Sequence, residues 1–148
     1  VGSEMCIRDS YFTQYPAVYA YMQSIKQQAH QQGFVQTLMG RKLYLPDINS
    51  RRTRQRQAAE RAAINAPMQG SAAELIKLAM INIQNWLDQK KLVSRMILQV
   101  HDELVFEVPK EELILIKEHL PPLMTEIVSL TVPLKVTIGV GKNWEEAH

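Results

Sequence analysis

The chain is poor in the features that define several classes of protein. A single cysteine, Cys6, among 148 residues excludes an internal disulfide framework and a cysteine-rich zinc site. The longest apolar runs are far short of the roughly 20 residues that a membrane helix needs, and the N-terminus lacks the apolar core of a secretory signal. Hydrophobic residues still make up 46% of the chain. This composition predicts a globular domain, or part of one, in a reducing cytoplasmic setting.

The net charge of +2 hides two regions of opposite sign. Between Arg41 and Arg61, seven basic residues against two acids leave +5, and from Asp102 to His148, four lysines against nine acids leave −5. Such segregation suggests a basic surface for a polyanion and an acidic region elsewhere. A solvated charged loop explains the count equally well.

The pattern of apolar residues predicts helices mixed with short strands. Gly33 is placed to end the first helix, Pro67 to interrupt the next, and Pro121-Pro122 to kink or divide the last. We expect helices at residues 11–32, 53–63, 70–87 and 111–128, hairpins at 34–45 and 96–108, and a final strand at 132–140. These elements predict an α+β fold with helices packed on an antiparallel sheet. Residues 1–10 fit no element, and we interpret them as an unrelated leader or scar.

The helix expected at 70–87 is strongly amphipathic. Glu74, Lys77 and Asn82 lie off its apolar stripe. We interpret the whole stripe as core: Ala72, Leu75, Ile76, Ala79, Met80, Ile83, Trp86 and Leu87. Tyr15 and Tyr19 lie on the apolar face of the first helix, where we expect packing in preference to a platform on which bases stack.

The hairpin at 96–108 has an unusual tip. Two β-prone runs meet at His101, Asp102 and Glu103, without the Gly or Asn that tight turns prefer. Rigid strands that aim carboxylates at one point suit a magnesium site for phosphoryl transfer. A solvated acidic turn is the alternative, and the pattern alone does not exclude it.

Four blocks of the sequence, in order, resemble family A DNA polymerases. The blocks are residues 34–46, residues 59–70 (AERAAINAPMQG), residues 99–108 (QVHDELVFEV) and residues 143–148 (NWEEAH). The resemblance runs from about Tyr11 to the last residue. It implies that 11–57 is the C-terminal part of the fingers subdomain and that 58–148 belongs to a partial palm, the antiparallel sheet with packed helices that carries catalysis.

The resemblance also implies roles for individual residues. Asp102 would be one of two metal-binding aspartates, with Glu103 as a supporting catalytic carboxylate. Contacts to the DNA minor groove near the primer terminus would come from Arg61, Asn65, Gln69 and His101. Phosphate contacts would come from Arg41, Lys42, Arg51, Arg52, Arg54 and Arg56, which would supply sequence-blind affinity. An ion pair for Arg61 and a helix cap before Pro67 for Asn65 remain alternatives.

The activity implied is template-directed nucleotidyl transfer in DNA replication and repair by a two-metal mechanism. Magnesium is the expected cofactor, and primer–template DNA and deoxynucleoside triphosphates are the expected partners. We expect a full-length monomer in the bacterial cytoplasm, associated with the nucleoid and not with a membrane. The family's Asp-Tyr-Ser-Gln-Ile-Glu motif, which carries the other aspartate, is absent from these 148 residues, so we expect the fragment to be inactive alone. The alternatives are a non-catalytic DNA-binding remnant and a small metal-dependent phosphoesterase.

Overall fold

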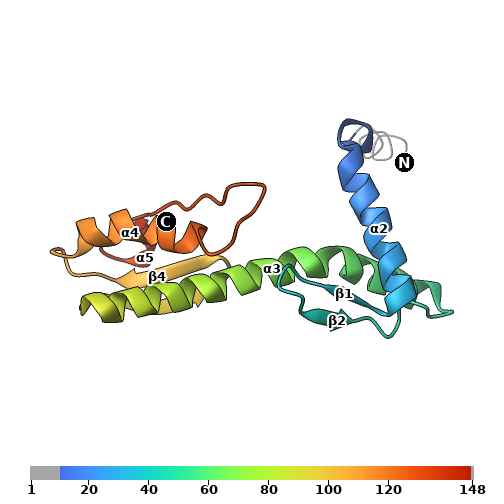
Figure 1. Cartoon of the computed structure of the whole chain (residues 1–148), viewed down its shortest axis with the longest axis horizontal. Helices are drawn as coiled ribbons and strands as arrows, with labels where there is room; N and C mark the ends of the chain where they lie inside the picture. The colour runs from blue at the N-terminus through green and yellow to red at the C-terminus, as the bar shows by residue number, and fades with distance from the viewer. Residues whose placement is uncertain (1–10, 148) are drawn as a thin grey trace. The chain divides into compact units, whose positions relative to one another are not determined.

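The computed structural model describes residues 11–147, so the expected leader at 1–10 and the terminal His148 lie outside the described residues. Figure 1 shows helices α2 (Pro16–Gln32), α3 (Thr53–Lys90), α4 (Leu113–Thr125) and α5 (Trp144–Ala147). Strands β1 (Phe34–Gln36) and β2 (Lys42–Tyr44) form one antiparallel pair, and β3 (Arg95–Val100) and β4 (Glu103–Glu107) form another. This mixture confirms the α+β class. The chain divides into two compact units, of which unit 1 ends at Ser71 and unit 2 begins at Ala72.

Helix α2 begins at Pro16, later than expected, and ends where the sequence predicts. Proline suits the first turn because its missing N–H has no partner there. Gly33 follows the helix with φ +75°, a left-handed conformation that favours glycine, and its N–H donates to the Ala29 carbonyl oxygen over 2.8 Å. The chain then enters the expected first hairpin, in which Val35 lies opposite Leu43.

The core of unit 1 joins α2, the first hairpin with the loop after it, and the N-terminal half of α3. Ala29 and Ala63 are fully buried, so these two helices contribute small side chains to the same core. The buried residues are Ile25, Ala29, Val35, Leu45, Ile48, Ala59 and Ala63. Through Ala59 and Ala63, this core holds the N-terminal half of α3 against α2 and the first hairpin.

Two tyrosines predicted to pack do not join that core. Tyr15 and Tyr19 are 47% and 48% exposed. Their rings lie 5.0 Å from the Tyr11 ring and 5.2 Å from the Phe12 ring, respectively. The prediction is wrong because the buried residues of α2 begin only at Ile25, two turns further along the helix.

Helix α3 is continuous through Pro67, which contradicts the predicted interruption. Proline at this position removes the donor to the Ala63 carbonyl and costs roughly 3 kcal/mol in a helix interior. The helix on either side is nevertheless held by packing, because Ala63 lies in the core of unit 1 and Glu74 and Ala79 are buried beyond Pro67. The Ser71 hydroxyl also donates to the Pro67 carbonyl oxygen. Burial on both sides therefore outweighs the local cost.

Within residues 11–147, no helix is long and apolar enough to cross a membrane.

In unit 2, the C-terminal half of α3 and helix α4 pack with the β3–β4 hairpin (Figure 1). The buried side chains of this core are Ile83, Leu87, Ile116 and Leu120, and Trp86, Met96, Leu104 and Phe106 pack against them. The expected core stripe is thus confirmed around Ile83 and Leu87 but not at Ala72, which is exposed. Glu74, expected off the stripe, is only 7% exposed.

The C-terminal region departs from two predictions. Helix α4 is shorter than expected, and Pro121-Pro122 does not divide it. Residues 132–140 form no strand, because β3 and β4 pair only with each other among the described residues and an extended segment without a neighbour has no ladder to join. This segment lies against α5 instead, where a Cβ on Gly139 would clash with the Ala147 carbonyl oxygen.

Glu112 ties the start of α4 to the segment before β3. Its carboxylate accepts hydrogen bonds from the backbone N–H groups of Val93 and Ser94, each at 2.9 Å, and from the Ser94 hydroxyl. The Ser94 hydroxyl, and after it the Val93 N–H, holds the pKa of Glu112 below its ordinary value of 4.5. The position of the second hairpin against α4 therefore depends on an ionised carboxylate.

We expect Glu112→Gln to lower the free energy of unfolding at pH 7. Because the folded state has the lower pKa, ionised Glu112 stabilises the fold above about pH 4.5, and this contribution is lost as the pH falls through the folded pKa. Urea unfolding at several pH values should show the difference between variant and wild type closing in acid. Glu111→Gln, at the exposed neighbouring acid, is the matched control. A difference that stays constant with pH would contradict the assignment.

Candidate active site

The tip of the second hairpin is a two-residue loop. Val100 pairs with Glu103, so only His101 and Asp102 lie between the strands, and Glu103 opens β4 instead of belonging to the turn as expected. His101 has φ +52°, a left-handed conformation that is uncommon without glycine. The Gln99 side-chain amide donates to the His101 carbonyl oxygen over 3.0 Å and so braces the loop.

This loop presents an acidic group from a strained, supported backbone. His101 and Asp102 are exposed, whereas Glu103 is half-buried. Left-handed backbone in a non-glycine residue costs free energy, of order 1 kcal/mol, and such strain concentrates at functional sites. The register shift between Met96 and Leu98 in β3 is a second irregularity of the same hairpin. Two-residue hairpin loops commonly need a left-handed residue, which His101 provides here.

Asp102 and Glu103 are adjacent donors of hard oxygen atoms. Magnesium sites in proteins commonly use one or two carboxylates, with water and phosphate oxygens at the other positions, so the chemistry of this pair suits Mg²⁺. Within residues 11–147, no group of three or more His, Cys, Asp and Glu side chains is arranged to hold a metal ion. The donors offered at the tip are therefore these two carboxylates.

A second set of predicted residues shares one face of α3. Arg61, Asn65 and Gln69 are all exposed, and the helix is unbroken between them. Their spacing of four residues places successive side chains about one turn apart, over about 12 Å of helix length. Arg54 lies seven residues before Arg61 and continues the same face. Because α3 continues through Pro67, the side chains of Arg61, Asn65 and Gln69 lie on one face of a single helix.

The structure decides between the alternatives for two of these residues. Asn65 lies inside α3, so it is not a helix cap. No ion pair involves Arg61 among the described residues, and the preceding Glu60 is paired with Lys26, His30 and Arg56. The Arg61 guanidinium is therefore available to a ligand.

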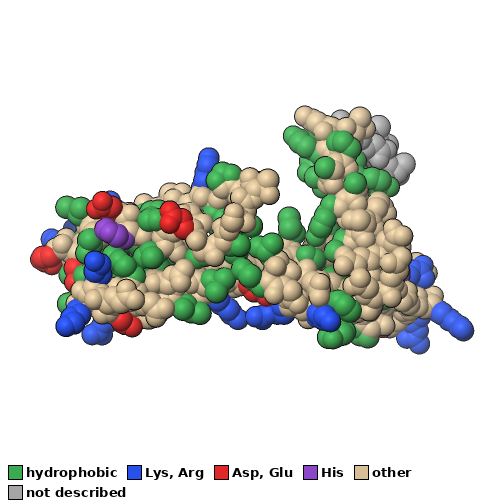
Figure 2. Space-filling model, in the orientation of Figure 1, with side chains coloured by type: hydrophobic (Ala, Val, Ile, Leu, Met, Phe, Trp, Pro, Cys, Tyr) green, Lys and Arg blue, Asp and Glu red, His purple; other side chains and the backbone are tan. Residues whose placement is uncertain are grey.

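The basic residues predicted to contact phosphate differ in whether their side chains are exposed to solvent or held by other groups of the chain. Arg51, Arg52 and Arg54 are exposed, and Figure 2 shows Lys and Arg side chains projecting from this part of unit 1. Arg56 is less available, because its Nε lies 3.9 Å from Glu60 and its Nη1 donates to the Ser50 carbonyl oxygen over 3.2 Å. Arg41 is exposed near the first hairpin. The side chains of Arg51, Arg52 and Arg54 are therefore more available to a ligand than that of Arg56.

Lys42 is also exposed, but its ammonium group has a partner within the chain. Its Nζ lies 4.5 Å above the centre of the Phe34 ring, within the range of a cation–π interaction. A contact to phosphate would require this side chain to leave the ring or to extend past it.

A network that the sequence did not reveal holds the loop carrying these arginines. His30 Nδ1 lies 2.9 Å from Asn49 Oδ1, and its Nε2 lies 3.2 Å from Glu60 Oε1. The Asn49 amide also donates to the His30 carbonyl oxygen over 3.1 Å. Lys26 adds an ion pair to Glu60 at 3.8 Å. Helix α2, the loop before α3 and α3 itself are therefore joined by polar contacts, and sequence separations of 19 and 30 residues left no local signal for them.

The predicted residues thus form two groups in different units. Arg61, Asn65 and Gln69 are brought together on α3 in unit 1, and His101, Asp102 and Glu103 on the hairpin of unit 2. One group offers hydrogen-bond donors and positive charge along a helix face. The other offers carboxylates at a braced tip. Such a pairing suits a protein that handles a phosphate-bearing polymer.

Comparison with known proteins identifies the class to which these features belong. Residues 4–146 match DNA polymerase family A, and the chain belongs to this family. It is 54% identical over 140 residues to DNA polymerase I of Pseudomonas aeruginosa, covering 95% of this chain and 15% of that protein. It is 48% identical over 139 residues to DNA polymerase I of Bacillus caldotenax, covering 94% of this chain and 16% of that protein.

A solved structure supports the fold. The chain resembles the polymerase domain of Pol1 from M. smegmatis, solved in complex with DNA primer-template and dNTP, with a TM-score of 0.92 and 42% sequence identity. The match covers 95% of this chain and 25% of that one. The chain therefore spans about a sixth of the length of the curated relatives named above.

Proposed function

We propose that this chain is the C-terminal portion of a DNA-dependent DNA polymerase, contributing part of the fingers (11–57) and the palm (58–148). The observation that carries the proposal is Asp102 at the tip of a braced hairpin, in a chain that belongs to DNA polymerase family A. The proposed border at residue 57 falls inside α3, whereas the compact units divide after Ser71. The activity would be template-directed nucleotidyl transfer in DNA replication and repair.

In this proposal the second hairpin supplies half of a metal site. Asp102 would hold magnesium, and Glu103 would support the same site from the first position of β4. When bound, magnesium would neutralise charge on the reacting phosphate and help to align the attacking oxygen. The hairpin's own task is to keep the carboxylates in place, which the two-residue loop and the Gln99 hydrogen bond favour. The other aspartate of a two-metal site would come from outside these 148 residues.

The face of α3 would contact the duplex near the primer terminus. Arg61, Asn65 and Gln69 carry N–H donors, and minor-groove acceptors are almost the same for every base pair. Donors placed there test the geometry of a pair without reading its sequence, as a template-directed enzyme requires. His101, on the hairpin of unit 2, would be a further contact to the duplex.

The basic loop before α3 would add phosphate contacts. Arg51, Arg52 and Arg54 are exposed, so they would bind DNA in a salt-dependent and sequence-independent way. Glu60 and His30 would act only indirectly, by holding the loop. Primer–template DNA and deoxynucleoside triphosphates are the proposed partners of the complete protein.

The proposal predicts that the 148-residue chain alone does not polymerise DNA, because it contributes only one aspartate of the clamp. The test is incorporation of labelled nucleotide on a primer–template with Mg²⁺, with the full-length parent as positive control. Template-directed incorporation by the fragment, abolished by Asp102→Ala, would overturn the prediction.

The same assay separates the alternatives. Tighter binding of primer–template in the presence of Mg²⁺ supports the polymerase portion over a non-catalytic DNA-binding remnant. Hydrolysis of a simple phosphodiester by the isolated chain would instead favour a phosphoesterase.

A further inference from the structure

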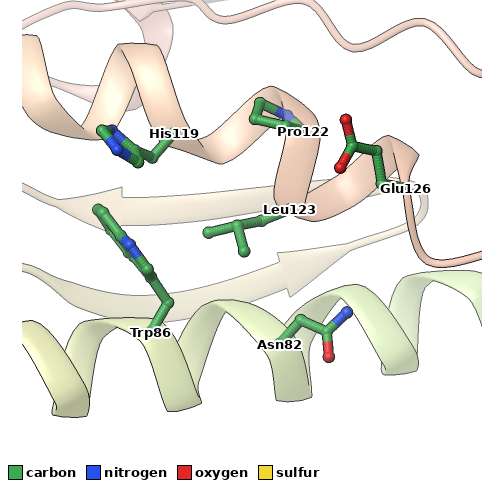
Figure 3. Close-up of a pocket in the computed structure, with 6 residues that line it drawn as sticks. All are labelled: Asn82, Trp86, His119, Pro122, Leu123 and Glu126. Atoms are coloured by element: carbon green, nitrogen blue, oxygen red, sulfur yellow. The ribbon is translucent and has the colours of Figure 1, made fainter.

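Unit 2 contains a pocket that the proposed polymerase function does not use. It has a volume of about 300 Å³, which is within the lower range of small-ligand sites. Figure 3 shows its lining from helices α3 and α4: Asn82, Trp86, His119, Pro122, Leu123 and Glu126. None of these residues belongs to the β3–β4 hairpin or to the polar face of α3 in unit 1.

One wall of the pocket is a stacked pair of rings. The Trp86 and His119 rings lie 5.2 Å apart between centroids, with 21° between their planes. His119 Nδ1 lies 3.0 Å from the Leu115 carbonyl oxygen, which can only accept, so Nδ1 carries the proton. In the neutral ring, Nε2 is then left as an acceptor. The wall therefore offers flat aromatic surface and a hydrogen-bond acceptor.

Helix α4 adds a second acceptor for a reason visible in the sequence. A helical carbonyl accepts from the N–H three or four residues further on, and for Glu118 both positions are proline. Pro121 and Pro122 have no N–H, so the Glu118 carbonyl oxygen has neither helical donor. Pro122 lines the pocket, one turn after Glu118 on the same helix.

Negative charge gathers at the same end of α4. Glu126 is exposed, lines the pocket and is the residue that follows the last turn of the helix. The C-terminal end of a helix carries partial negative charge, so Glu126 and the helix dipole attract cations together. Asn82, exposed on α3 across the pocket, adds a polar side chain to the lining.

We propose that this pocket binds a planar organic cation of the guanidinium class. The aromatic wall formed by Trp86 and His119 suits a flat cation, and the acceptor on His119 together with the Glu126 carboxylate suits a ligand with several N–H donors. An anion would meet Glu126 and the negative end of α4. A purely apolar ligand would gain nothing from the Glu126 carboxylate or from the negative end of α4. The cation is either a free small molecule or an arginine side chain of a peptide.

The test uses the tryptophan fluorescence of the 148-residue chain. The chain has two tryptophans, and Trp144→Phe leaves Trp86 as the only one. Titration with N-acetylarginine amide should give a saturable change in Trp86 emission. N-acetylcitrulline amide has nearly the same shape without the charge, and it should bind at least roughly tenfold more weakly.

Two variants assign the binding to the pocket. Glu126→Gln should weaken binding of the arginine amide roughly fivefold, because the lost charge is exposed and partly screened. Glu111→Gln removes an exposed acid beyond the other end of α4 and should leave the affinity unchanged. Circular dichroism would reveal whether Glu126→Gln disturbs the fold. If it does, the affinity of Asn82→Ala, a smaller change on α3, for the arginine amide gives a second test of binding at the pocket.

Each outcome is decisive. Binding of the free amide identifies a small-molecule site, and binding only of a Gly-Gly-Arg-Gly-Gly peptide identifies an arginine in a peptide chain as the ligand. Failure of both ligands, equal binding of the citrulline compound, or equal weakening by Glu111→Gln and Glu126→Gln would overturn the proposal. Polymerase activity is not measured, so this result stands apart from the proposed function.

Discussion

Asp102→Ala in the full-length polymerase should abolish nucleotide incorporation while leaving primer–template affinity nearly unchanged. The proposed role of this carboxylate is to hold magnesium at the reacting phosphate, and such an electrostatic contribution is worth several kcal/mol in the transition state. Loss of it should lower kcat at least about 1,000-fold. DNA affinity should persist because the exposed arginines and the polar face of α3 lie in unit 1 and are not altered.

The measurement is single-turnover incorporation together with fluorescence anisotropy of labelled primer–template. Asp88→Ala is a matched control, because Asp88 is also an exposed aspartate of unit 2, and its carboxylate accepts a hydrogen bond from the neighbouring Gln84 side chain. That variant should retain near-normal rates. Glu103→Ala should reduce the rate less than Asp102→Ala does, since Glu103 is proposed as a supporting group.

If Asp102→Ala kept a rate within tenfold of wild type, the assignment of Asp102 as a metal ligand would be wrong. A large loss of DNA affinity with an intact rate at saturating DNA would assign the hairpin to binding instead of catalysis. Both results are distinguishable from misfolding by comparing the circular dichroism of the variants.

Arg61→Ala and Gln69→Ala should cut the rate of incorporation and change how the enzyme discriminates against mispaired primer ends. Both side chains lie on the exposed face of one continuous helix, with Asn65 between them. A donor that reaches a minor-groove acceptor only when the pair has correct geometry stabilises the correct pair alone. Each such hydrogen bond is worth about 1–3 kcal/mol, so discrimination should change by about tenfold or more.

The measurement is extension of matched and mismatched primer ends at saturating nucleotide, at two salt concentrations. Asn85→Ala is the control, since Asn85 is exposed on the same helix but lies in its C-terminal part. If Arg61→Ala and Gln69→Ala lowered only overall affinity, equally for matched and mismatched ends, their role as sensors of pairing geometry would fail. They would then be general contacts like the exposed arginines of the loop.

The parts of the fold that the sequence predicted are those governed by neighbouring residues. Gly33 ends α2 because a left-handed residue is needed directly after the helix, and the two hairpins follow from short apolar runs on either side of a turn. The apolar spacing around Ile83 and Leu87 likewise predicted their burial. In each case the physical cause lies within a few residues of the position concerned.

The incorrect predictions concern effects of more distant residues. Pro67 was expected to break a helix, and the local cost is real, but burial of turns on both sides keeps α3 continuous. Residues 132–140 have the composition of a strand, yet a strand needs a neighbour to accept its hydrogen bonds, and the described sheet offers none. Composition could predict neither packing nor pairing.

The predictions about the candidate site show the same difference between local and distant effects. The sequence by itself determined which residue types stand at the proposed site: the carboxylates beside His101, and the donors spaced along one helix from Arg61. Only the tertiary structure decided that the hairpin loop has two residues with a left-handed first position, and that Glu60 binds His30 and Arg56. Residue identity and spacing are local properties of the chain, whereas backbone strain, burial and ion pairing depend on which distant groups folding brings into contact.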